Sequence, residues 1–293
     1  MLELTKFSSP PMRLVSWSDN RLQRATGVCR IAVSGSKDGN EVIDVFQQSP
    51  LRVIFPRIDG AAVKEAVLIN TGGGIAGGDS LECGVTAMAG ASIAVTSQTA
   101  ERVYRALDQP ARILTKLKVG AGAKLAWLPH ETIVFNWARF HRQTEVDILP
   151  GSELLALEGL VFGRAAHGEQ MLGGEICESW RVKREGRLIW ADTFRVGEEV
   201  FPHVNRKALL SNSKAVATLI YFGTQLDERL GLVREISRSF DCFCGATRVA
   251  GLIIVRLAAK ESWTLKLALT ALLQKLSPEF GDGPFRVPRM WSC

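Results

Sequence analysis

Four acidic residues occupy turn-like, glycine-flanked or inward-facing settings in which a carboxylate could do chemistry: Asp79, Glu131, Glu169 and Asp192. Carboxylate oxygens bind hard divalent cations, and two facing carboxyl groups can hydrolyse a glycosidic bond when their separation is suitable. The sequence does not give that separation, so a cation site and a carboxylate-based hydrolase both stay open at this point. Taken singly, each acid is more often a turn former or an ion-pair member.

Asp79 closes a stretch from Asn70 to Ser80 in which five of eleven residues are glycine. Glycine adopts positive φ without steric cost and lets another backbone approach closely, so the stretch predicts a constrained turn or a contact surface. The apolar run at 66–69 before it and the alternating apolar residues at 81–87 after it are typical of strands. We therefore expect a tight connection between two strands.

Two phosphate-binding patterns nearly fit the same stretch. Residues 72–77 match the spacing of the dinucleotide fingerprint, and residues 73–80 match the P-loop except that Asp79 stands in the place of lysine. Both patterns deliver phosphate to a helix N-terminus, whereas the residues that follow alternate like a strand. A carboxylate also repels phosphate. A nucleotide-binding enzyme that uses Gly72 to Gly78 is therefore the alternative hypothesis.

Cysteine and histidine give weaker signals for metal chemistry. Cys242 and Cys244 have the spacing of a ligand pair, but no second Cys or His pair stands at zinc-site spacing, so buried thiols are the favoured interpretation. The histidines lie far apart and none forms an H-x-x-x-H arrangement; they stand at positions 130, 141, 167 and 203. No serine or cysteine has a recognisable nucleophile context.

We expect strands to position most of these residues. Apolar runs separated by turn signals recur about every ten residues through the first 60 positions, which is typical of strands. Similar patterns continue at 112–119, 146–148, 176–182 and 188–196. Two later segments, 224–240 and 262–276, have helical spacing, and the segment 100–107 fits either a helix or a strand. The sequence thus predicts a mainly β fold of many short strands, with two α-helices in the C-terminal third.

The strand expected at 188–196 places an acid among apolar side chains. Leu188, Trp190, Phe194 and Val196 share one face of this strand, and Asp192 lies on the same face. An acid that faces inward needs a partner or a functional reason.

The composition is that of an ordinary globular protein, with 293 residues, 46% apolar and 23% charged residues, and a net charge of +6. We find no dense Lys/Arg block that would favour nucleic acid and no apolar run long enough for a membrane span. The N-terminus lacks the pattern of a signal peptide, so we expect a cytoplasmic protein with reduced cysteines. We expect one continuous domain over residues 1–293, with a C-terminal tail that packs on the surface through Trp291.

A series of motifs, in order along the chain, resembles the UreD family of urease accessory proteins, called UreH in some bacteria. The similarity runs from about residue 25 to the C-terminus, and the residues that carry it are Ser49 to Arg52, Gly72 to Asp79, Thr96 to Gln98 with Val103 to Arg105, Pro129 to Ile133, Gly163 to Glu169 and Pro288 to Trp291. The chain has Ser97 where the family often has Thr, and His130 where it often has Gln. His130 raises the question whether the site beside Glu131 is lined by oxygen alone.

The resemblance implies a protein that is not an enzyme, with strands wound in a helical, solenoid-like course. It implies a hetero-oligomer with UreF, which recruits the GTPase UreG, and with apo-urease. Nickel released by GTP hydrolysis in UreG would reach the urease site through a channel in the UreD-like subunit. The resemblance implies no tightly bound cofactor, only Ni²⁺ in transit.

The acids then acquire a role as a transient nickel path. Motif position assigns Asp79, Glu131 and Glu169 to this path, and the inward position of Asp192 adds a fourth member. Spaced carboxylates attract a cation without trapping it, whereas nitrogen and sulfur ligands hold Ni²⁺ more tightly. Arg164 is expected to hold a carboxylate in place.

Overall fold

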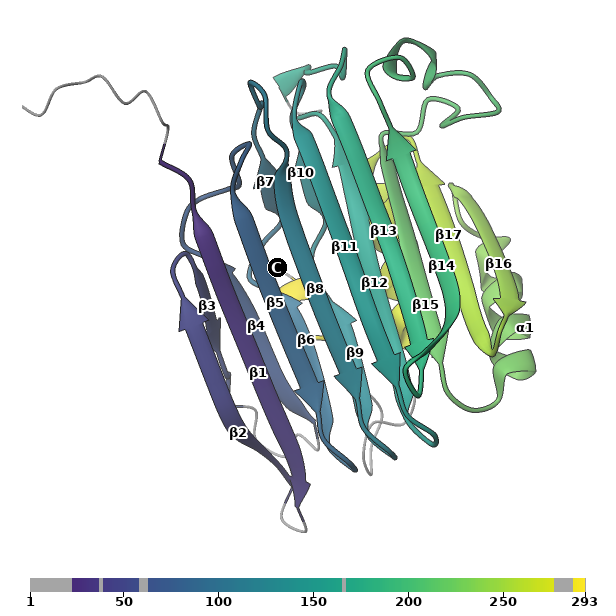
Figure 1. Cartoon of the computed structure of the whole chain (residues 1–293). Coiled ribbons are helices and arrows are strands. Elements are labelled where there is room, and N and C mark those ends of the chain that lie inside the picture. Colours follow the sequence, from purple (N-terminus) through teal and green to yellow (C-terminus); the bar gives the residue numbers. More distant parts are fainter. Residues whose placement is uncertain (1–22, 37–38, 58–62, 165–166, 277–286, 293) are drawn as a thin grey trace, which may run out of the picture.

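Two β-sheets lie face to face, and helices cover the outer side of one of them (Figure 1). The computed structural model describes residues 23–36, 39–57, 63–164, 167–276 and 287–292. Tail residues 281–286 and Cys293 therefore lie outside the described part of the chain.

The first sheet has seven strands, in the spatial order β14-β13-β11-β8-β5-β1-β2. Its strands are β1 (Thr26–Ser36), β2 (Gly39–Gln48), β5 (Ser80–Ala87), β8 (Ala111–Val119), β11 (Arg139–Ile148), β13 (Glu175–Arg184) and β14 (Arg187–Val196). The five central strands are parallel, and β2 and β14 add to the two edges in antiparallel fashion.

The second sheet has ten strands, and the spatial order of its main path is β16-β17-β15-β12-β9-β6-β4-β3. Two short strands lie off this path, where β10 pairs with both β12 and β7. The strands are β3 (Leu51–Ile54), β4 (Lys64–Asn70), β6 (Ser92–Ser97), β7 (Glu101–Val103), β9 (Lys124–Leu128), β10 (Thr132–Val134), β12 (Glu153–Phe162), β15 (Ala215–Phe222), β16 (Phe243–Val249) and β17 (Leu252–Ala259).

From β4 to β13 the chain passes repeatedly from one sheet to the other, and each passage adds a parallel strand. This course is solenoid-like and confirms the mainly β prediction. Residues alternate in and out along the strands, so inward side chains of the two sheets pack together. Val85, Leu117 and Trp180 from the first sheet meet Ile93 and Leu125 from the second in this core.

Helices α1 (Leu226–Ser237) and α2 (Ser262–Leu276) confirm the two predicted helices. They pack on the outer face of the second sheet, which needs a cover because its strands carry apolar residues on both faces. Two 3₁₀ turns, η2 (Phe201–His203) and η3 (Arg289–Ser292), complete the described elements. The ambiguous segment 100–107 contains the strand β7, because residues 101–103 pair in register with β10.

The C-terminal segment is anchored inside the molecule by Trp291, which is 6% exposed. Its Nε1 donates a hydrogen bond to the carbonyl of Leu128 at 3.0 Å. Its ring stacks on His130 with 5.4 Å between centroids and 17° between planes. The tail residue predicted to anchor at the surface therefore contributes to the helix-side core.

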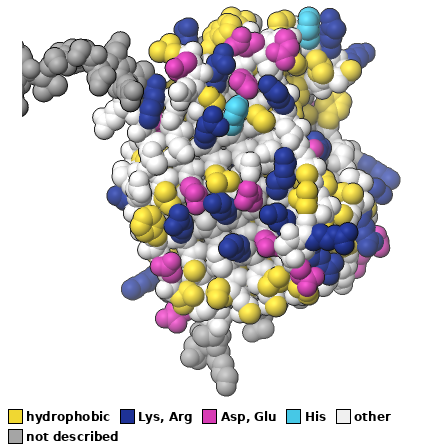
Figure 2. Space-filling model, in the orientation of Figure 1, with side chains coloured by type: hydrophobic (Ala, Val, Ile, Leu, Met, Phe, Trp, Pro, Cys, Tyr) yellow, Lys and Arg dark blue, Asp and Glu magenta, His cyan; other side chains and the backbone are white. Residues whose placement is uncertain are grey.

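The outer face of the first sheet carries charges of both signs side by side (Figure 2). Glu82 lies 3.4 Å from Arg30 and 3.5 Å from Lys116, and Glu175 lies 3.1 Å from His141. Such exposed pairs contribute little to stability. None of the helices in the described part of the chain is long and apolar enough to cross a membrane.

The packing of α2 predicts a contrast between two leucines on the same helix. Leu272 is fully buried, whereas Leu267 is 54% exposed. Leu272→Ala should lower the free energy of unfolding by about 2–5 kcal/mol, because a cavity replaces packed atoms. Leu267→Ala, the matched control, should change it by no more than about 0.5 kcal/mol. Denaturant unfolding of the two variants measures both, and equal losses would contradict the described packing.

Candidate functional site

A cavity of about 210 Å³ lies between the two sheets. Its walls come from both sheets, and the segments around Ser97 and His130 close one side of it. The wall residues include Cys83, Thr115 and Arg142 from the first sheet, and Leu68, Trp127 and Glu158 from the second. The cavity therefore brings apolar surface and ionisable groups together inside the solenoid.

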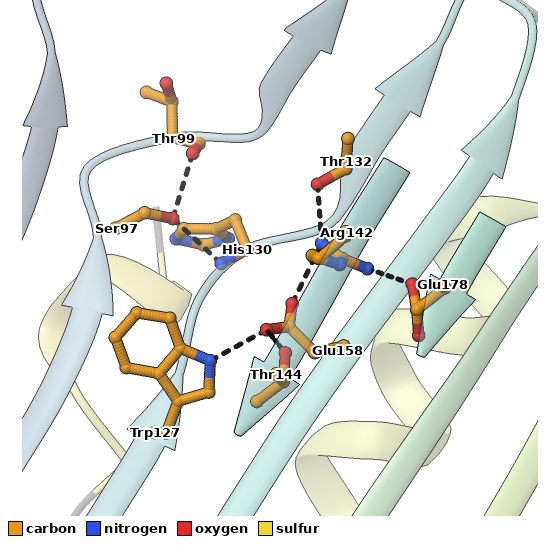
Figure 3. A network of polar contacts seen from close by, with 9 residues as sticks. All are labelled: Ser97, Thr99, Trp127, His130, Thr132, Arg142, Thr144, Glu158 and Glu178. Atoms are coloured by element: carbon orange, nitrogen blue, oxygen red, sulfur yellow. Dashed lines mark hydrogen bonds and ion pairs between the residues drawn. The ribbon is translucent and has the colours of Figure 1, made fainter. Parts of the chain in front are cut away.

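Arg142 connects the two sheets through this core (Figure 3). Its Nη1 lies 2.9 Å from Glu158 of the second sheet and donates to Thr132 Oγ1 at 3.0 Å. Its Nη2 binds Glu178, the residue opposite it in the β11–β13 register. Arg142, Glu158 and Glu178 are 4%, 2% and 5% exposed, so all three ionisable groups are removed from water.

Glu158 has three polar partners in this network, as many as Arg142 has. Besides Arg142, its carboxylate accepts hydrogen bonds from Trp127 Nε1 at 2.9 Å and from Thr144 Oγ1 at 3.3 Å. Burial raises the pKa of Glu158, and the neighbouring Arg142 opposes that rise. With both acids ionised, one guanidinium faces two carboxylates, which leaves the network one negative charge.

This network is not among the sites predicted from the sequence, although the strands carry a signal for it. Arg142 lies on the inward face of β11 between Phe140 and Thr144, and Glu178 lies between buried neighbours on β13. Glu158 interrupts an apolar run that fills β12. Charged residues are almost never buried unless they are paired, so an ionisable residue at an inward strand position indicates a partner.

Asp79 lies outside the lining of the cavity. Its two carboxylate oxygens accept hydrogen bonds from the backbone amides of Ala25 and Ala76, each at 2.8 Å. The side chain thus ties the glycine stretch to the start of β1. This is the turn-forming geometry that the single-residue interpretation favours, and the role of Asp79 in a metal path stays a prediction.

The glycine stretch connects β4 of the second sheet to β5 of the first, which confirms the predicted connection between two strands. At Gly77 a Cβ atom would lie 2.5 Å from the Cβ of Ala106, so only glycine fits there. β5 begins at Ser80, directly after Asp79. The helix N-terminus that both phosphate motifs require is replaced by this strand, which removes the structural basis for a phosphate cradle.

Glu169 is held by Arg164, as the sequence predicted for that arginine. The guanidinium donates to the carboxylate at 3.0 and 3.1 Å, and the Arg164 amide donates at 3.0 Å. These contacts lower the pKa of Glu169. Glu169 also lines a separate cavity of about 440 Å³ at the end of the sheets.

Glu131 and Asp192 lie apart from each other, and neither lines the inter-sheet cavity. Glu131 Oε2 is 4.0 Å from His130 Nδ1 and borders a small hollow against α2. Asp192 pairs with Arg256 of the second sheet at 2.5 Å, so the inward-facing acid has its partner. Leu188, predicted on the same face, is instead 51% exposed, because a register shift in the β13–β14 pair changes the facing of residues near the turn.

The structure therefore does not bring the four predicted acids together. Among the described residues no group of three or more His, Cys, Asp or Glu side chains could hold a metal ion. Cys242 and Cys244 are half-buried thiols beside the helices, and burial raises the pKa of Cys244 to about 11. The described residues form a cavity with a charged network in its wall, but they do not form a preformed metal-binding site.

Comparison with known proteins gives a consistent result over nearly the whole chain. The family model described as UreD urease accessory protein matches residues 25–292. The chain is 38% identical to the urease accessory protein UreD of Azorhizobium caulinodans over 272 residues, which cover 93% of this chain and 98% of the relative. It is 34% identical to that of Mesorhizobium japonicum over 292 residues, with 99% of each chain covered.

The buried network predicts a pH-dependent loss of stability in Arg142→Met. Removing the guanidinium leaves buried carboxylates without a cation, which should cost about 3–5 kcal/mol near neutral pH. Without Arg142 the pKa of Glu158 rises further, so the folded state binds more protons than the unfolded state and the loss shrinks as pH falls. Urea unfolding at about pH 5 and about pH 8 measures this difference.

A triple variant gives the control for this prediction. Arg142→Met combined with Glu158→Leu and Glu178→Leu removes the charges together, so it should recover most of the stability lost by Arg142→Met alone. A loss in Arg142→Met that is the same at both pH values would show that the network is not the cause.

Proposed function

The chain belongs to the UreD urease accessory protein family, and we propose that it acts in urease maturation as a scaffold and a conduit for Ni²⁺. In this proposal it receives nickel from a complex of UreF with the GTPase UreG and passes it to apo-urease. GTP hydrolysis belongs to UreG, and this chain makes and breaks no covalent bond.

The inter-sheet cavity is the observation that carries the conduit role. A conduit through a solenoid must pass between its sheets, and this cavity is lined there by residues of both. The carboxylate of Glu158 lies in its wall as a member of a network that carries a net negative charge when both of its acids are ionised. The Coulomb attraction between this network and a divalent cation is stronger than that of water-exposed acids at the same distance, since the local dielectric is low, and the cost of removing water from the ion opposes it.

The same network also explains why the ion would move on. The Arg142 guanidinium lies between the two acids and repels a divalent cation that approaches them (Figure 3). Attraction by the excess carboxylate and repulsion by the guanidinium together favour weak occupancy. A transit site needs this balance, because conduction requires that an ion enter readily and leave readily.

The four acids named from the sequence are proposed to act at the approaches to the cavity. Glu131 is the nearest of them along the chain, because its neighbours His130 and Thr132 both line the cavity. Asp79 and Asp192 already bind protein partners, so a passing ion would have to compete with those contacts. Their contribution is therefore expected to be smaller than that of Glu158.

Exposed apolar side chains support the scaffold role. Trp263 and Leu267 on α2 are 65% and 54% exposed, and Phe243 on the edge strand β16 is 60% exposed. Exposed large apolar side chains that form a patch are typical of protein–protein contacts, and Trp263 and Leu267 lie one helical turn apart on α2. This surface is a candidate for contact with an accessory partner or with apo-urease.

Replacing the buried acid tests the conduit. Cells that carry a complete urease operon are compared with cells in which this gene is deleted or encodes Glu158→Gln. Glutamine keeps the shape of the side chain but removes its charge, so urease activity and nickel content should fall about tenfold, the change that ~1.4 kcal/mol of lost cation attraction produces. Glu228→Gln on the exposed face of α1 is the matched control and should behave as the wild type.

The possible outcomes separate the two roles. If the deletion leaves urease activation unchanged, the proposed function is wrong. If the deletion abolishes activation but Glu158→Gln matches the wild type, the chain acts as a scaffold and nickel does not depend on this acid. A melting temperature of the variant close to that of the wild type is required before reduced activation is assigned to the charge.

A further inference from the structure

The connections between the two sheets differ in length at the two ends of the strands. At one end they are turns of four residues, at 88–91, 120–123 and 149–152. At the other end they hold nine to thirteen residues, at 71–79, 98–110, 129–138 and 163–174. We call this the long-loop end; it is the upper end in Figure 1. In solenoids the longer insertions gather on one face, which is often the binding face.

Three of these long connections each expose a large apolar side chain. Leu107, Trp137 and Leu172 are 77%, 39% and 62% exposed. Backbone hydrogen bonds hold their segments side by side, because the amide of Ala106 donates to the carbonyl of Trp137 at 3.1 Å and the amide of Trp137 donates to the carbonyl of Gly173 at 3.0 Å. The three side chains therefore form one apolar group on the surface, which we call the Trp137 patch.

The fold holds Trp137 in an unusual backbone conformation at the centre of this patch. Its φ is +62°, in the left-handed region that is rare for a bulky residue. A Cβ atom at Gly173 would lie 2.3 Å from the indole ring, so the glycine makes room for it. Asn136 Oδ1 accepts a hydrogen bond from the amide of Leu172 at 2.7 Å and holds the two connections together. Such conformations persist where surrounding contacts enforce them, often at functional sites.

Positive charge borders the patch. Arg105 forms a β-bridge with Ala138, the residue after Trp137. Its side chain is exposed, and no ion pair joins it to another residue of the described ranges. The same connection carries a second exposed arginine, Arg102, and one exposed acid, Asp108. A partner that matches this border presents carboxylates around an apolar surface.

The patch is also continuous with the wall of the inter-sheet cavity. Tyr104 Oη donates to the carbonyl of Gly73 at 2.7 Å, and its ring packs edge-on against Phe135 with 5.2 Å between centroids. Gly73 and Arg102 both line the cavity. Because Arg102 is exposed as well, the cavity wall reaches the molecular surface beside the patch. A protein bound to the patch would therefore lie next to the cavity.

We propose that the Trp137 patch and Arg105 form the docking surface for a partner protein of urease maturation that presents apolar side chains flanked by carboxylates. The inference rests on the proposed function and names the place where a protein that exchanges nickel with the cavity binds. Tryptophan and arginine are enriched among the residues that carry most of the binding energy in protein interfaces. Exposed apolar patches with a polar border are typical of such interfaces.

Co-purification from cells that express a complete urease operon tests the surface. The full chain carries an affinity tag, and mass spectrometry measures how much of each operon-encoded protein it retains. Trp137→Gly removes the indole, and glycine adopts the positive φ freely, so the variant should melt close to the wild type. Its retention of one operon-encoded partner should fall at least about tenfold, as on truncation of a central interface residue.

The matched control lies at the opposite end of the strands. Leu149 is 39% exposed, as Trp137 is, but it belongs to one of the four-residue turns. Leu149→Ala should retain every partner as the wild type does. Wild-type retention by a folded Trp137→Gly would overturn the inference.

Reversing the charge of Arg105 tests the acidic character of the partner without touching the packing. Arg105→Glu should lower retention several-fold in dilute buffer, and its difference from the wild type should shrink at about 1 M salt, where charges are screened within about 3 Å. Arg187→Glu, an exposed arginine after the turn that precedes β14, is the control and should have no effect. Unchanged or higher retention by Arg105→Glu would overturn the inference, and this variant decides alone if Trp137→Gly does not fold.

These outcomes can be told apart from failure of the proposed function. If gene deletion abolishes urease activation while Trp137→Gly and Arg105→Glu retain all partners, the proposed function stands and the docking surface is wrong. If the two variants lose a partner while gene deletion leaves urease activation unchanged, the docking surface is right and the proposed function is wrong.

Discussion

The interior of this protein depends on the ion pairs of one buried arginine. Arg142 projects from the first sheet and binds Glu158 of the second sheet and Glu178 of its own. Each of these ions would be costly to bury alone, so the pair of sheets must hold the three at contact distance. The network and the cavity beside it therefore depend on each other, because polar groups that bridge two sheets keep apolar side chains from filling the gap.

The solenoid makes such an interior possible. Each passage of the chain between the sheets adds one parallel strand to one layer, so two successive passages extend both layers, and inward residues recur at every second position. An inward polar residue on β11 lies beside its counterpart on the adjacent strand β13 and can face an inward residue of β12 across the gap between the sheets. The C-terminal segment then closes this region, where Trp291 packs on His130 and fixes one wall of the cavity.

The fold was largely readable from the sequence, whereas the site was not. Strand periodicity and the helical stripes at 224–240 and 262–276 gave the architecture, because local patterns determine which face of an element is buried. The site depends on contacts between distant strands, such as Glu158 with Arg142, which no local pattern contains. Asp79 is the opposite case. It lies in a prominent sequence motif, but in the structure its carboxylate accepts two backbone hydrogen bonds. The sequence did contain one indication of the site, namely ionisable residues at inward strand positions. Only Asp192 was predicted from it.

The central claim is that nickel passes between the two sheets beside Glu158. Anomalous diffraction at the nickel edge, from crystals of the accessory complex soaked in Ni²⁺, tests it most directly. The account predicts an anomalous peak inside the inter-sheet cavity that is absent from crystals of Glu158→Gln. Peaks confined to other parts of the chain, with the cavity free of nickel in the wild type, would contradict it.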